Sequence, residues 1–466
     1  MESWSWPPAY DETFVPERGQ RHWFRRRETM PAEERDALIL ERIRAVMGYA
    51  YERAPFYRRK WDDAGIDPGA IRSFEDFERV PVVTKEELRL AQADHPPFGD
   101  YLCVAEAEVA HIHGTSGTTG RPTAFGVSHA DWRAIANAHA RILWSMGVRP
   151  GDTVFIASFF SLYMGSWGAL IGAERLGARV FPFGAGVPGQ TLRAVMWLKE
   201  MRPDAIYATP SYALHLAEVA RGEGIEPREF GIRILFFSGE PGASVTAIRG
   251  KIEDLYGGRV FDCGSMAEMS PWMTLAESDG QPGMLCWQDV VYTEVVDPAA
   301  LTRVPYGREG TPVYTHLERQ SQPMIRLLSN DLTRWEAGPG ADGRTYPILP
   351  KGIYGRIDDM FTVRGENVYP SAIDEIVMAL DHYGGEHRIV VSRDRAMDEL
   401  SVQVEADREL HAMGDGAIAG FRRSAEERLR TVLGVGARVD VVPPGTLERT
   451  EFKARRVVDR RDILRT

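Results

Sequence analysis

The chain has 466 residues and a mass of 52.2 kDa, a length that suits two or three domains. Hydrophobic residues make up 44% and charged residues 26%, which excludes a disordered or fibrous chain. Lysine and arginine number 56 against 67 acidic residues, so the net charge of −11 argues against a general nucleic-acid binder but leaves room for one basic pocket for an anion. Cys103, Cys263 and Cys286 are too few and too scattered for a disulfide framework or a zinc site, which favours a reducing, cytoplasmic compartment.

The N-terminus and one uncharged segment bear on membrane targeting. Residues 1–10 combine Glu2 with several aromatic residues and lack the basic-then-apolar order of a secretory signal. Residues 153–173 run for 21 residues without a charge, which is long enough for a membrane span. Because serines and glycines interrupt this segment, we predict a buried strand at 154–160, a Gly/Ser loop and then a helix rather than a span.

The periodicity of apolar residues predicts an α/β fold. The first 90 or so residues are expected to be helical, with one apolar face from Ile39 to Ala50 and a break near Ala54-Pro55. From residue 108 on, short apolar runs alternate with helical segments. Strands are expected at 153–160, 179–183, 205–208 and 232–237. This order is typical of a largely parallel sheet with crossover helices.

The C-terminal part of the sequence is predicted to form a separate, smaller domain. A Gly/Pro-rich stretch at 337–350 precedes it, and Pro370 is placed to begin a helix. Two strands (387–392 and 400–405), a helix (417–433) and a final strand (438–442) are expected to follow. We therefore predict a large domain of mixed sheets with helices over residues 1–357 and a small α+β domain over 358–466.

The sharpest chemical signal is the run Gly-Thr-Ser-Gly-Thr-Thr-Gly-Arg-Pro-Thr at residues 114–123. Its glycines let the backbone approach a polyanion, and its hydroxyls and Arg121 add donors and a positive charge, as in a phosphate-binding nest. It is not the common triphosphate loop, because no Gly-Lys-Ser/Thr follows. Composition alone also leaves a flexible turn open, whereas Ser116 as an acyl-transfer nucleophile lacks the Gly-x-Ser-x-Gly context.

This loop resembles the signature of the adenylate-forming enzymes, which include acyl-CoA synthetases, peptide-synthetase adenylation domains and luciferases. The chain is most similar to their phenylacetate–CoA ligase branch, and the matching motifs span nearly its whole length, at 51–58, 81–88, 172–177 and 209–212. The resemblance implies a large adenylate-forming domain, a hinge at Asp358 and a mobile C-terminal lid domain. It also implies ATP, Mg²⁺ and coenzyme A as cofactors and a small carboxylic acid as substrate, and it suggests a homodimer, with no nucleic-acid or membrane partner.

Position by position, the resemblance implies how ATP is held. The β- and γ-phosphates are expected at Thr115, Ser116, Gly117, Thr118, Thr119 and Gly120. The residues expected to flank adenine or to bind the cofactor nearby are Ser238, Gly239, Glu240, Pro241 and Asp262. Arg326 and Asp331 resemble the ribose-binding motif, in which a carboxylate can accept both ribose hydroxyls, and Arg356 resembles a further ribose or phosphate ligand.

The chemistry of adenylation explains the expected catalytic residues. A carboxylate repels the triphosphate that it must attack, so cations are needed where negative charge gathers. The resemblance assigns this to Arg121, to Mg²⁺ held by Glu268, and to Lys453, which would bridge the substrate carboxylate and the α-phosphate. Taken alone, Asp331 would more readily be a simple cap, Arg356 a surface ion pair and Lys453 one of many solvated basic residues. Their occurrence in the order of the family's motifs favours the functional roles.

The family's Tyr-Gly-x-Ser/Thr-Glu motif is altered at residues 264–268. Glu268 is kept, and its hard oxygens suit Mg²⁺. Gly264 replaces the aromatic residue that would stack on adenine, Ser265 replaces the glycine, and Ala267 replaces the hydroxyl residue. A missing stack costs on the order of 1 kcal/mol of ATP binding. The missing hydroxyl indicates an altered acceptor or substrate.

The acid is expected to bind in a pocket lined by Phe160, Tyr163, Ala267 and Trp272. Aromatic walls favour a flat apolar acid, although the same residues could be ordinary core. No unpaired cation stands out for a second carboxylate, so we expect an aromatic monocarboxylic acid.

The sequence therefore predicts an ATP-dependent acid–CoA ligase that acts through an acyl-adenylate and releases AMP and pyrophosphate. An adenylating enzyme that uses an amine or another non-thiol acceptor, and a nucleotide-binding module with reduced catalysis, are the alternatives. A nicotinamide-dependent oxidoreductase is suggested by Gly-x-Gly-x-x-Gly at 184–189 with Asp204 downstream, but Pro188 lies inside that turn.

Overall fold

The computed structural model describes residues 6–115, 123–162, 164–184, 189–240, 242–264, 266–269, 274–357, 361–363, 366–394, 397–448 and 456–460.

The helices of the larger domain are α1 (Arg25–Thr29), α2 (Ala32–Arg53), α3 (Pro55–Asp63), α4 (Phe74–Phe77), α5 (Lys85–Asp94), α6 (His129–Met146), α7 (Met164–Leu176), α8 (Thr191–Met201), α9 (Pro210–Gly222) and α10 (Thr246–Tyr256). Its strands are β1 (Val109–Gly114), β2 (Ala124–Ser128), β3 (Thr153–Ile156), β4 (Arg179–Phe181), β5 (Ala205–Ala208), β6 (Ile234–Phe237), β7 (Arg259–Gly264), β8 (Leu275–Ser278), β9 (Gln281–Cys286), β10 (Val291–Val296), β11 (Glu309–His316), β12 (Leu327–Leu328), β13 (Asp331–Arg334), β14 (Ile348–Leu349) and β15 (Gly355–Arg356).

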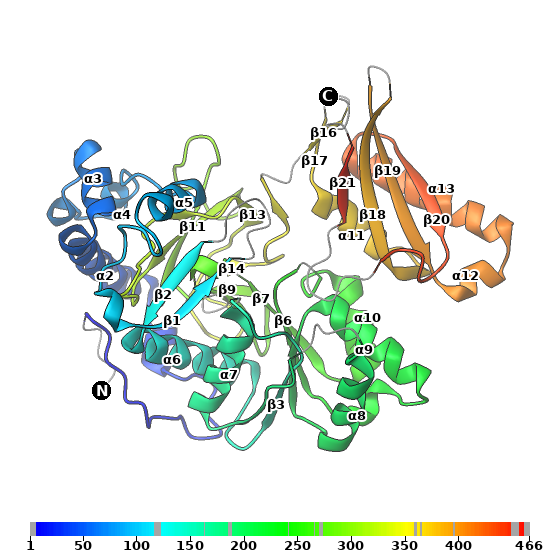
Figure 1. The fold of residues 1–466 in the computed structure, drawn as a ribbon, viewed down its shortest axis with the longest axis horizontal. Coiled ribbons are helices and arrows are strands. Elements are labelled where there is room, and N and C mark those ends of the chain that lie inside the picture. Colours follow the sequence, from blue (N-terminus) through cyan, green and yellow to red (C-terminus); the bar gives the residue numbers. More distant parts are fainter. Residues whose placement is uncertain are drawn as a thin grey trace.

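An eight-stranded sheet in the order β14-β9-β8-β7-β6-β5-β3-β4 forms the centre of this domain (Figure 1). The strands β4, β3, β5, β6 and β7 are parallel, as the alternation of apolar runs and helices predicted. Every residue of β3, β5 and β6 is buried. Strands that are buried on both faces show a continuous apolar run in the sequence instead of an alternation, which is why these strands could be recognised. The strand predicted at 154–160 is shorter than expected, because it ends at Ile156 and the chain then turns into a loop before α7.

Helix α2 has the predicted apolar face, and two smaller sheets complete the domain. Ile39, Ile43, Val46 and Ala50 of α2 are all fully buried, and α2 ends at Arg53, one residue before the predicted break. A second sheet has the order β10-β11-β13-β15 with β12 on β11, and β1 pairs with β2 in a hairpin.

The C-terminal domain is the α+β unit that was predicted. Its elements are β16 (Phe361–Val363), β17 (Glu366–Val368), α11 (Pro370–Met378), β18 (Tyr383–Asp394), β19 (Met397–Ala406), α12 (Arg408–Ala412), α13 (Asp415–Leu433), β20 (Ala437–Val442) and β21 (Val457–Asp459). The sheet order is β20-β19-β18-β21, and β21 was not predicted. The proposed hinge Asp358 lies outside the described residues, so a domain boundary at that position stays a prediction.

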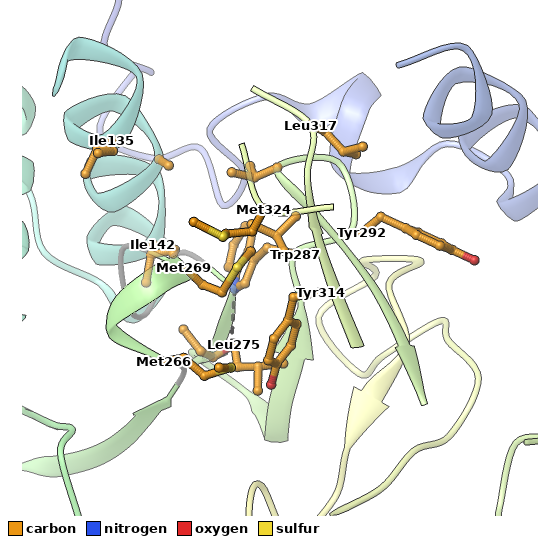
Figure 2. Close-up of a cluster of buried hydrophobic side chains, with 14 of the residues drawn as sticks. Ile135, Ile142, Met266, Met269, Leu275, Trp287, Tyr292, Tyr314, Leu317 and Met324 are labelled. Atoms are coloured by element: carbon orange, nitrogen blue, oxygen red, sulfur yellow. Dashed lines mark hydrogen bonds between the residues drawn. The ribbon is translucent and has the colours of Figure 1, made fainter. Parts of the chain in front are cut away.

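The main hydrophobic core lies between α6 and the antiparallel strands (Figure 2). Met266, Met269 and Leu275 pack there with Trp287 and Tyr314, and each is at most 6% exposed. Trp287 Nε1 donates a hydrogen bond to the Ala276 carbonyl at 3.3 Å. This packing places residues 266–269 against the core.

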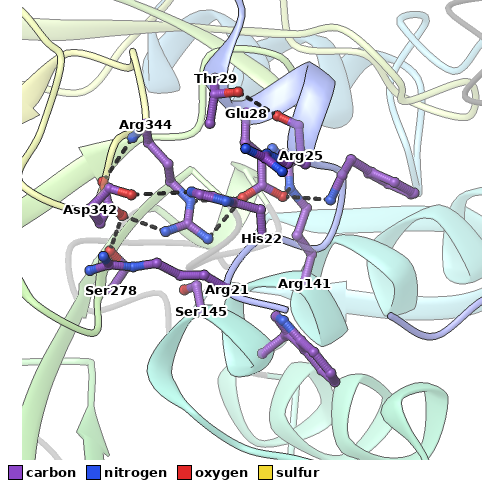
Figure 3. A network of polar contacts seen from close by, with 12 residues as sticks. Arg21, His22, Arg25, Glu28, Thr29, Arg141, Ser145, Ser278, Asp342 and Arg344 are labelled. Carbon is purple, nitrogen blue, oxygen red and sulfur yellow. Dashed lines mark hydrogen bonds and ion pairs between the residues drawn. The ribbon is translucent and has the colours of Figure 1, made fainter. Parts of the chain in front are cut away.

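A buried network of ions fastens the N-terminal segment to the domain (Figure 3). The carboxylate of Glu28 in α1 is fully buried and accepts hydrogen bonds from Arg141 Nε at 2.9 Å and Arg344 Nε at 2.8 Å. Arg141 also pairs with Asp289 at 2.8 Å, and Arg344 pairs with Asp342. Several guanidinium groups and carboxylates thus compensate one another away from water.

Cys103, Cys263 and Cys286 are all buried and free. None of the helices in the described ranges combines the length and the apolar character that crossing a bilayer requires. The uncharged segment at 153–173 forms β3, a loop and most of α7.

Candidate active site

The loops that follow the parallel strands meet at one edge of the central sheet, where ligands bind in open α/β sheets. Ser238 follows β6, and its hydroxyl lies 2.5 Å from the hydroxyl of Tyr207 in β5. The Glu240 carboxylate accepts a hydrogen bond from the Ser211 amide at 2.7 Å, which ties the loop after β6 to the start of α9. Gly239 between them has φ +95°, a conformation that favours glycine. The segment expected to flank adenine is therefore firmly held, up to Pro241, which lies outside the described residues.

Asp262 stands at the end of β7 in a buried polar cluster. Its carboxylate accepts a hydrogen bond from the Ser244 hydroxyl, and its amide donates to Glu277 at 2.9 Å. Glu277 is itself paired with Arg249 at 2.7 Å. Burial, followed by the charge of Glu277, raises the pKa of Asp262 to about 7. The Asp262 carboxyl group is therefore protonated over much of the acidic pH range. In the protonated form it can also donate a hydrogen bond.

We expect Asp262→Asn to remove a pH-dependent loss of stability. Between about pH 4 and pH 7 the folded protein keeps a proton that the unfolded chain has released, so the free energy of unfolding falls as the pH rises. Asparagine does not ionise and still accepts from Ser244. The variant should therefore gain stability relative to wild type as the pH rises from about 4 to about 7, as measured by urea unfolding. A difference between the two proteins that is independent of pH would contradict this assignment.

Glu268 is presented by the short helical turn η4 (Ala267–Met269). Met266 and Met269 on either side of it are 6% and 0% exposed and anchor the turn in the core shown in Figure 2. The Glu268 side chain is 2% exposed; its Oε1 lies 3.6 Å from the Lys85 ammonium, and its Oε2 has no hydrogen-bond partner among the described residues. A buried, unsatisfied carboxylate oxygen of this kind suits a hard divalent cation such as Mg²⁺.

Lys85 is a functional candidate that the sequence analysis missed. Thr84 and Glu87 form a capping box that starts α5, so Lys85 occupies the first position of a helix. A positive charge at the N-terminus of a helix is unfavourable because it opposes the helix dipole. This unfavourable position of Lys85 is the feature of the sequence that could have identified it as functional. With its side chain 35% exposed beside Glu268, the Lys85 ammonium can act on an anion at the same place.

Arg326, expected in the ribose-binding motif, has a buried guanidinium that is engaged by other residues of the protein, and its role in binding the nucleotide stays a prediction. The residue is 1% exposed, its Nε pairs with Glu294 at 3.2 Å, and one terminal nitrogen donates to the carbonyls of Glu78 and Val80 at 2.5 and 2.6 Å. Residues 83 and 327 also form a bridge, with the Val83 amide bonded to the Arg326 carbonyl at 2.8 Å. Arg326 therefore braces the segment that leads to Lys85.

Asp331 and Arg356 lie next to each other on neighbouring strands. They lie opposite each other in the antiparallel pair β13–β15, and both are half-buried. Cross-strand partners share one face of a sheet, so the carboxylate and the guanidinium can reach one ligand. Their role in binding ribose stays a prediction.

The predicted phosphate loop joins β1 to β2. Thr115 and Thr123 close its base, with their hydroxyls 3.1 Å apart. Gly114 is required just before it, because an added Cβ would lie 2.7 Å from the Thr123 carbonyl oxygen. The remaining loop positions predicted to bind phosphate or to act in catalysis, Ser116, Gly117, Thr118, Thr119, Gly120 and Arg121, lie outside the described residues, as does Lys453.

The expected acid pocket is described in part. Phe160 is half-buried and meets Trp167 edge to face at 5.1 Å, and Ala267 is partly buried against the core. Tyr163 and Trp272 lie outside the described residues. A Cβ added to Gly264 would lie 3.4 Å from the Met284 methyl carbon, so a thioether borders the position at which the resemblance led us to expect an aromatic residue.

Comparisons with known proteins agree with this arrangement. A family model for AMP-binding enzymes matches residues 69–314, and a model for their C-terminal domain matches residues 365–461. The phenylacetate–coenzyme A ligase of Thermus thermophilus is 35% identical over 93% of this chain and 98% of its own length.

Crystal structures of a 2-hydroxyisobutyryl-CoA ligase are more similar still. In the postadenylation state with its acyl-adenylate, that enzyme is 62% identical, covers 100% of this chain and 98% of its own, and superposes with a TM-score of 0.96. In the thioesterification state with CoA, its TM-score is 0.77 at the same identity and coverage. This chain therefore superposes more closely on the postadenylation structure of that enzyme than on its thioesterification structure. The chain belongs to the AMP-binding enzymes, in the phenylacetate–CoA ligase branch, as an AMP-forming acyl-CoA ligase.

Proposed function

We propose that this ligase activates a small branched 2-hydroxy acid of the 2-hydroxyisobutyrate type. The observation that carries the proposal is the 62% identity, over the whole chain, to a 2-hydroxyisobutyryl-CoA ligase, against 35% to a phenylacetate–CoA ligase. The altered positions Gly264 and Ala267 support it, because they indicate a site that differs from the usual pattern of the family. This proposal replaces the aromatic acid that the sequence alone favoured.

The reaction divides into two displacements. In the first, a carboxylate oxygen of the acid attacks the α-phosphorus of ATP, and the bond to the bridging oxygen of pyrophosphate breaks. In the second, a CoA thiolate attacks the acyl carbon, and AMP leaves with the electron pair of the acyl–oxygen bond. Lys85, Lys453 and Arg121 would offset the negative charge of the first step, and Asp331 would hold the ribose.

Glu268 is the residue we propose to hold Mg²⁺. Its buried and unsatisfied Oε2 fits a hard cation, and the nearby ammonium of Lys85 keeps part of the carboxylate charge compensated. The ion would supply charge neutralisation for the phosphates.

A panel of acids tests the substrate. Purified protein is incubated with ATP, Mg²⁺ and either 2-hydroxyisobutyrate, isobutyrate or phenylacetate, with and without CoA, while pyrophosphate and acyl-CoA are measured. We expect the highest kcat/KM for 2-hydroxyisobutyrate, at least about tenfold above isobutyrate, because a site built for the hydroxyl leaves polar groups unpaired without it.

The other outcomes identify the alternatives. A preference for phenylacetate would support an aromatic acid, for which the edge-to-face pair of Phe160 and Trp167 is the favourable observation. Pyrophosphate without thioester would indicate a non-thiol acceptor. Absence of pyrophosphate with every acid would contradict ligase activity on this panel.

A further inference from the structure

Helix α11 of the C-terminal domain contributes to two different hydrophobic cores. Ile373 and Val377, about one helical turn apart, are fully buried in the core of the C-terminal domain. Met378, the last residue of α11, is 8% exposed and belongs instead to a core cluster of the larger domain. The other buried members of that cluster, among the described residues, all lie between residues 155 and 260. Met378 is therefore buried by a contact between the two domains.

Tyr383, the first residue of β18, makes a second contact of the same kind. Its ring is partly buried and packs against both the cluster of the larger domain and the core of the C-terminal domain. Its hydroxyl lies 2.9 Å from His387 Nδ1, and His387 Nε2 lies 2.7 Å from a carboxylate oxygen of Asp374 in α11. These polar contacts all lie within the C-terminal domain. Tyr383 is thus oriented by its own domain and presents its ring to the other one.

The apolar contact between the domains is small at this place. Leu214 of α9 and Leu255 of α10 are partly buried against the cluster, and they also line a cavity of about 360 Å³. Gly385 of the C-terminal domain lines the same cavity. Figure 1 shows α11 and β18 on the side of the C-terminal domain that lies towards α9 and α10. Because a cavity borders the contact, the contact depends on few side chains, above all Met378 and Tyr383.

The related 2-hydroxyisobutyryl-CoA ligase indicates in which state such a contact forms. This chain superposes on its postadenylation structure with a TM-score of 0.96, but on its open structure with 0.78 and on its thioesterification structure with 0.77. A turn of the C-terminal domain away from α9 and α10 would remove Met378 from the cluster. The apolar side chain would then be exposed to water, which is unfavourable.

We propose that burial of Met378 and Tyr383 against the core of the larger domain stabilises the arrangement seen here relative to the thioesterification arrangement, and that both are positioning residues for adenylation. The inference rests on the acyl-adenylate mechanism of the proposed function. The family model for the C-terminal domain covers residues 365–461, which include Lys453, the lysine proposed to act in adenylation. An equilibrium that docks this domain is therefore coupled to the first half of the cycle, and the contact opposes the second half.

Two spin labels measure the domain arrangement without any reaction. Lys199→Cys on α8 and Arg438→Cys on β20 place one label on each domain at an exposed position, and the three native cysteines are buried. Double electron–electron resonance then gives the populations of the arrangements. Met378→Gln keeps the length of the side chain but makes its end polar. We expect it to shift the equilibrium about tenfold away from the arrangement seen here.

The two half-reactions, measured separately, test the consequence for catalysis. ATP–pyrophosphate exchange with 2-hydroxyisobutyrate reports adenylation, and CoA thioester formation from synthetic acyl-adenylate reports the second step. We expect Met378→Gln to lower kcat for exchange about fivefold, while thioester formation is at least as fast as in wild type. A variant that only folded less well would lose both activities together.

Met378→Leu is the matched control, because leucine keeps an apolar side chain of similar volume. It should retain the wild-type distances between the labels and exchange pyrophosphate within about twofold of the wild-type rate. Met413→Gln changes a methionine of the same domain that is 54% exposed, and it should behave as wild type. Tyr383→Gln should shift the distances between the labels in the same direction as Met378→Gln.

The outcomes separate this inference from the proposed function. Unchanged label distances in Met378→Gln, equal losses in both half-reactions, or an effect of Met378→Leu as large as that of Met378→Gln would overturn the docking contact. Failure of the wild-type protein to exchange pyrophosphate with any acid would instead overturn the proposed function, and the label distances would still test the contact.

Discussion

The Lys453→Ala variant is expected to lose acid-dependent ATP–pyrophosphate exchange by about a hundred- to a thousandfold while its fold stays intact. The reason is electrostatic: the attacking carboxylate and the α-phosphate are both anions, and a preorganised ammonium between them stabilises the charge that concentrates there during attack. Lys453 matches the lysine that completes the adenylation site in related enzymes, and we propose this role for it here.

The experiment needs controls for folding and for general loss of charge. Lys199→Ala removes an exposed lysine of α8 and should leave exchange unchanged. Thioester formation from synthetic acyl-adenylate should persist in Lys453→Ala, because that step begins after the α-phosphate has reacted. Exchange at the wild-type rate in Lys453→Ala would remove our proposed role for this residue.

The Glu28→Gln variant is expected to lose about 3–5 kcal/mol of unfolding free energy. Burial alone would raise the pKa of Glu28, but Arg344 and Arg141 outweigh it and hold the pKa below its usual value. The carboxylate therefore contributes stability that is present above its unfolded-state pKa and is lost as the pH falls through the folded-state pKa. Glutamine fills the same space but leaves two buried guanidinium groups undercompensated.

Denaturant unfolding followed by tryptophan fluorescence measures this loss. Trp23 and Trp144 pack edge to face 5.8 Å apart near the ion network and report on it directly. The matched control is Glu34→Gln, which breaks an exposed 3.4 Å pair with Arg26 and should change stability by no more than about 0.5 kcal/mol. Similar losses in the two variants would show that burial of the network does not matter.

Much of the fold could be predicted because buried helices and strands have a recognisable pattern of apolar residues in the sequence. Strands β5 and β6 are buried throughout, so their apolar runs between helices indicated a parallel sheet. The expected helix at 417–433 corresponds to α13 without its first two residues. Strand β21 was missed because three residues carry too little periodicity to be recognised.

The site was predicted less completely, since a motif names residues but not the directions of their side chains. Arg326 lies within the expected ribose motif, yet its φ of +52° and its pairing with Glu294 place the guanidinium in the interior. Lys85 was overlooked because its relation to Glu268 joins segments more than 180 residues apart, which no local pattern records.

The burial of all three cysteines has a consequence for a protein that makes an acylating intermediate. An acyl-adenylate can transfer its acyl group to any accessible thiolate, and Cys263 follows Asp262 directly at the edge of the site. Burial raises the pKa of the Cys263 thiol well above its usual value, and it raises those of Cys103 and Cys286 to about 12. These sulfurs stay protonated and poorly nucleophilic, so the enzyme is protected from acylation by its own intermediate.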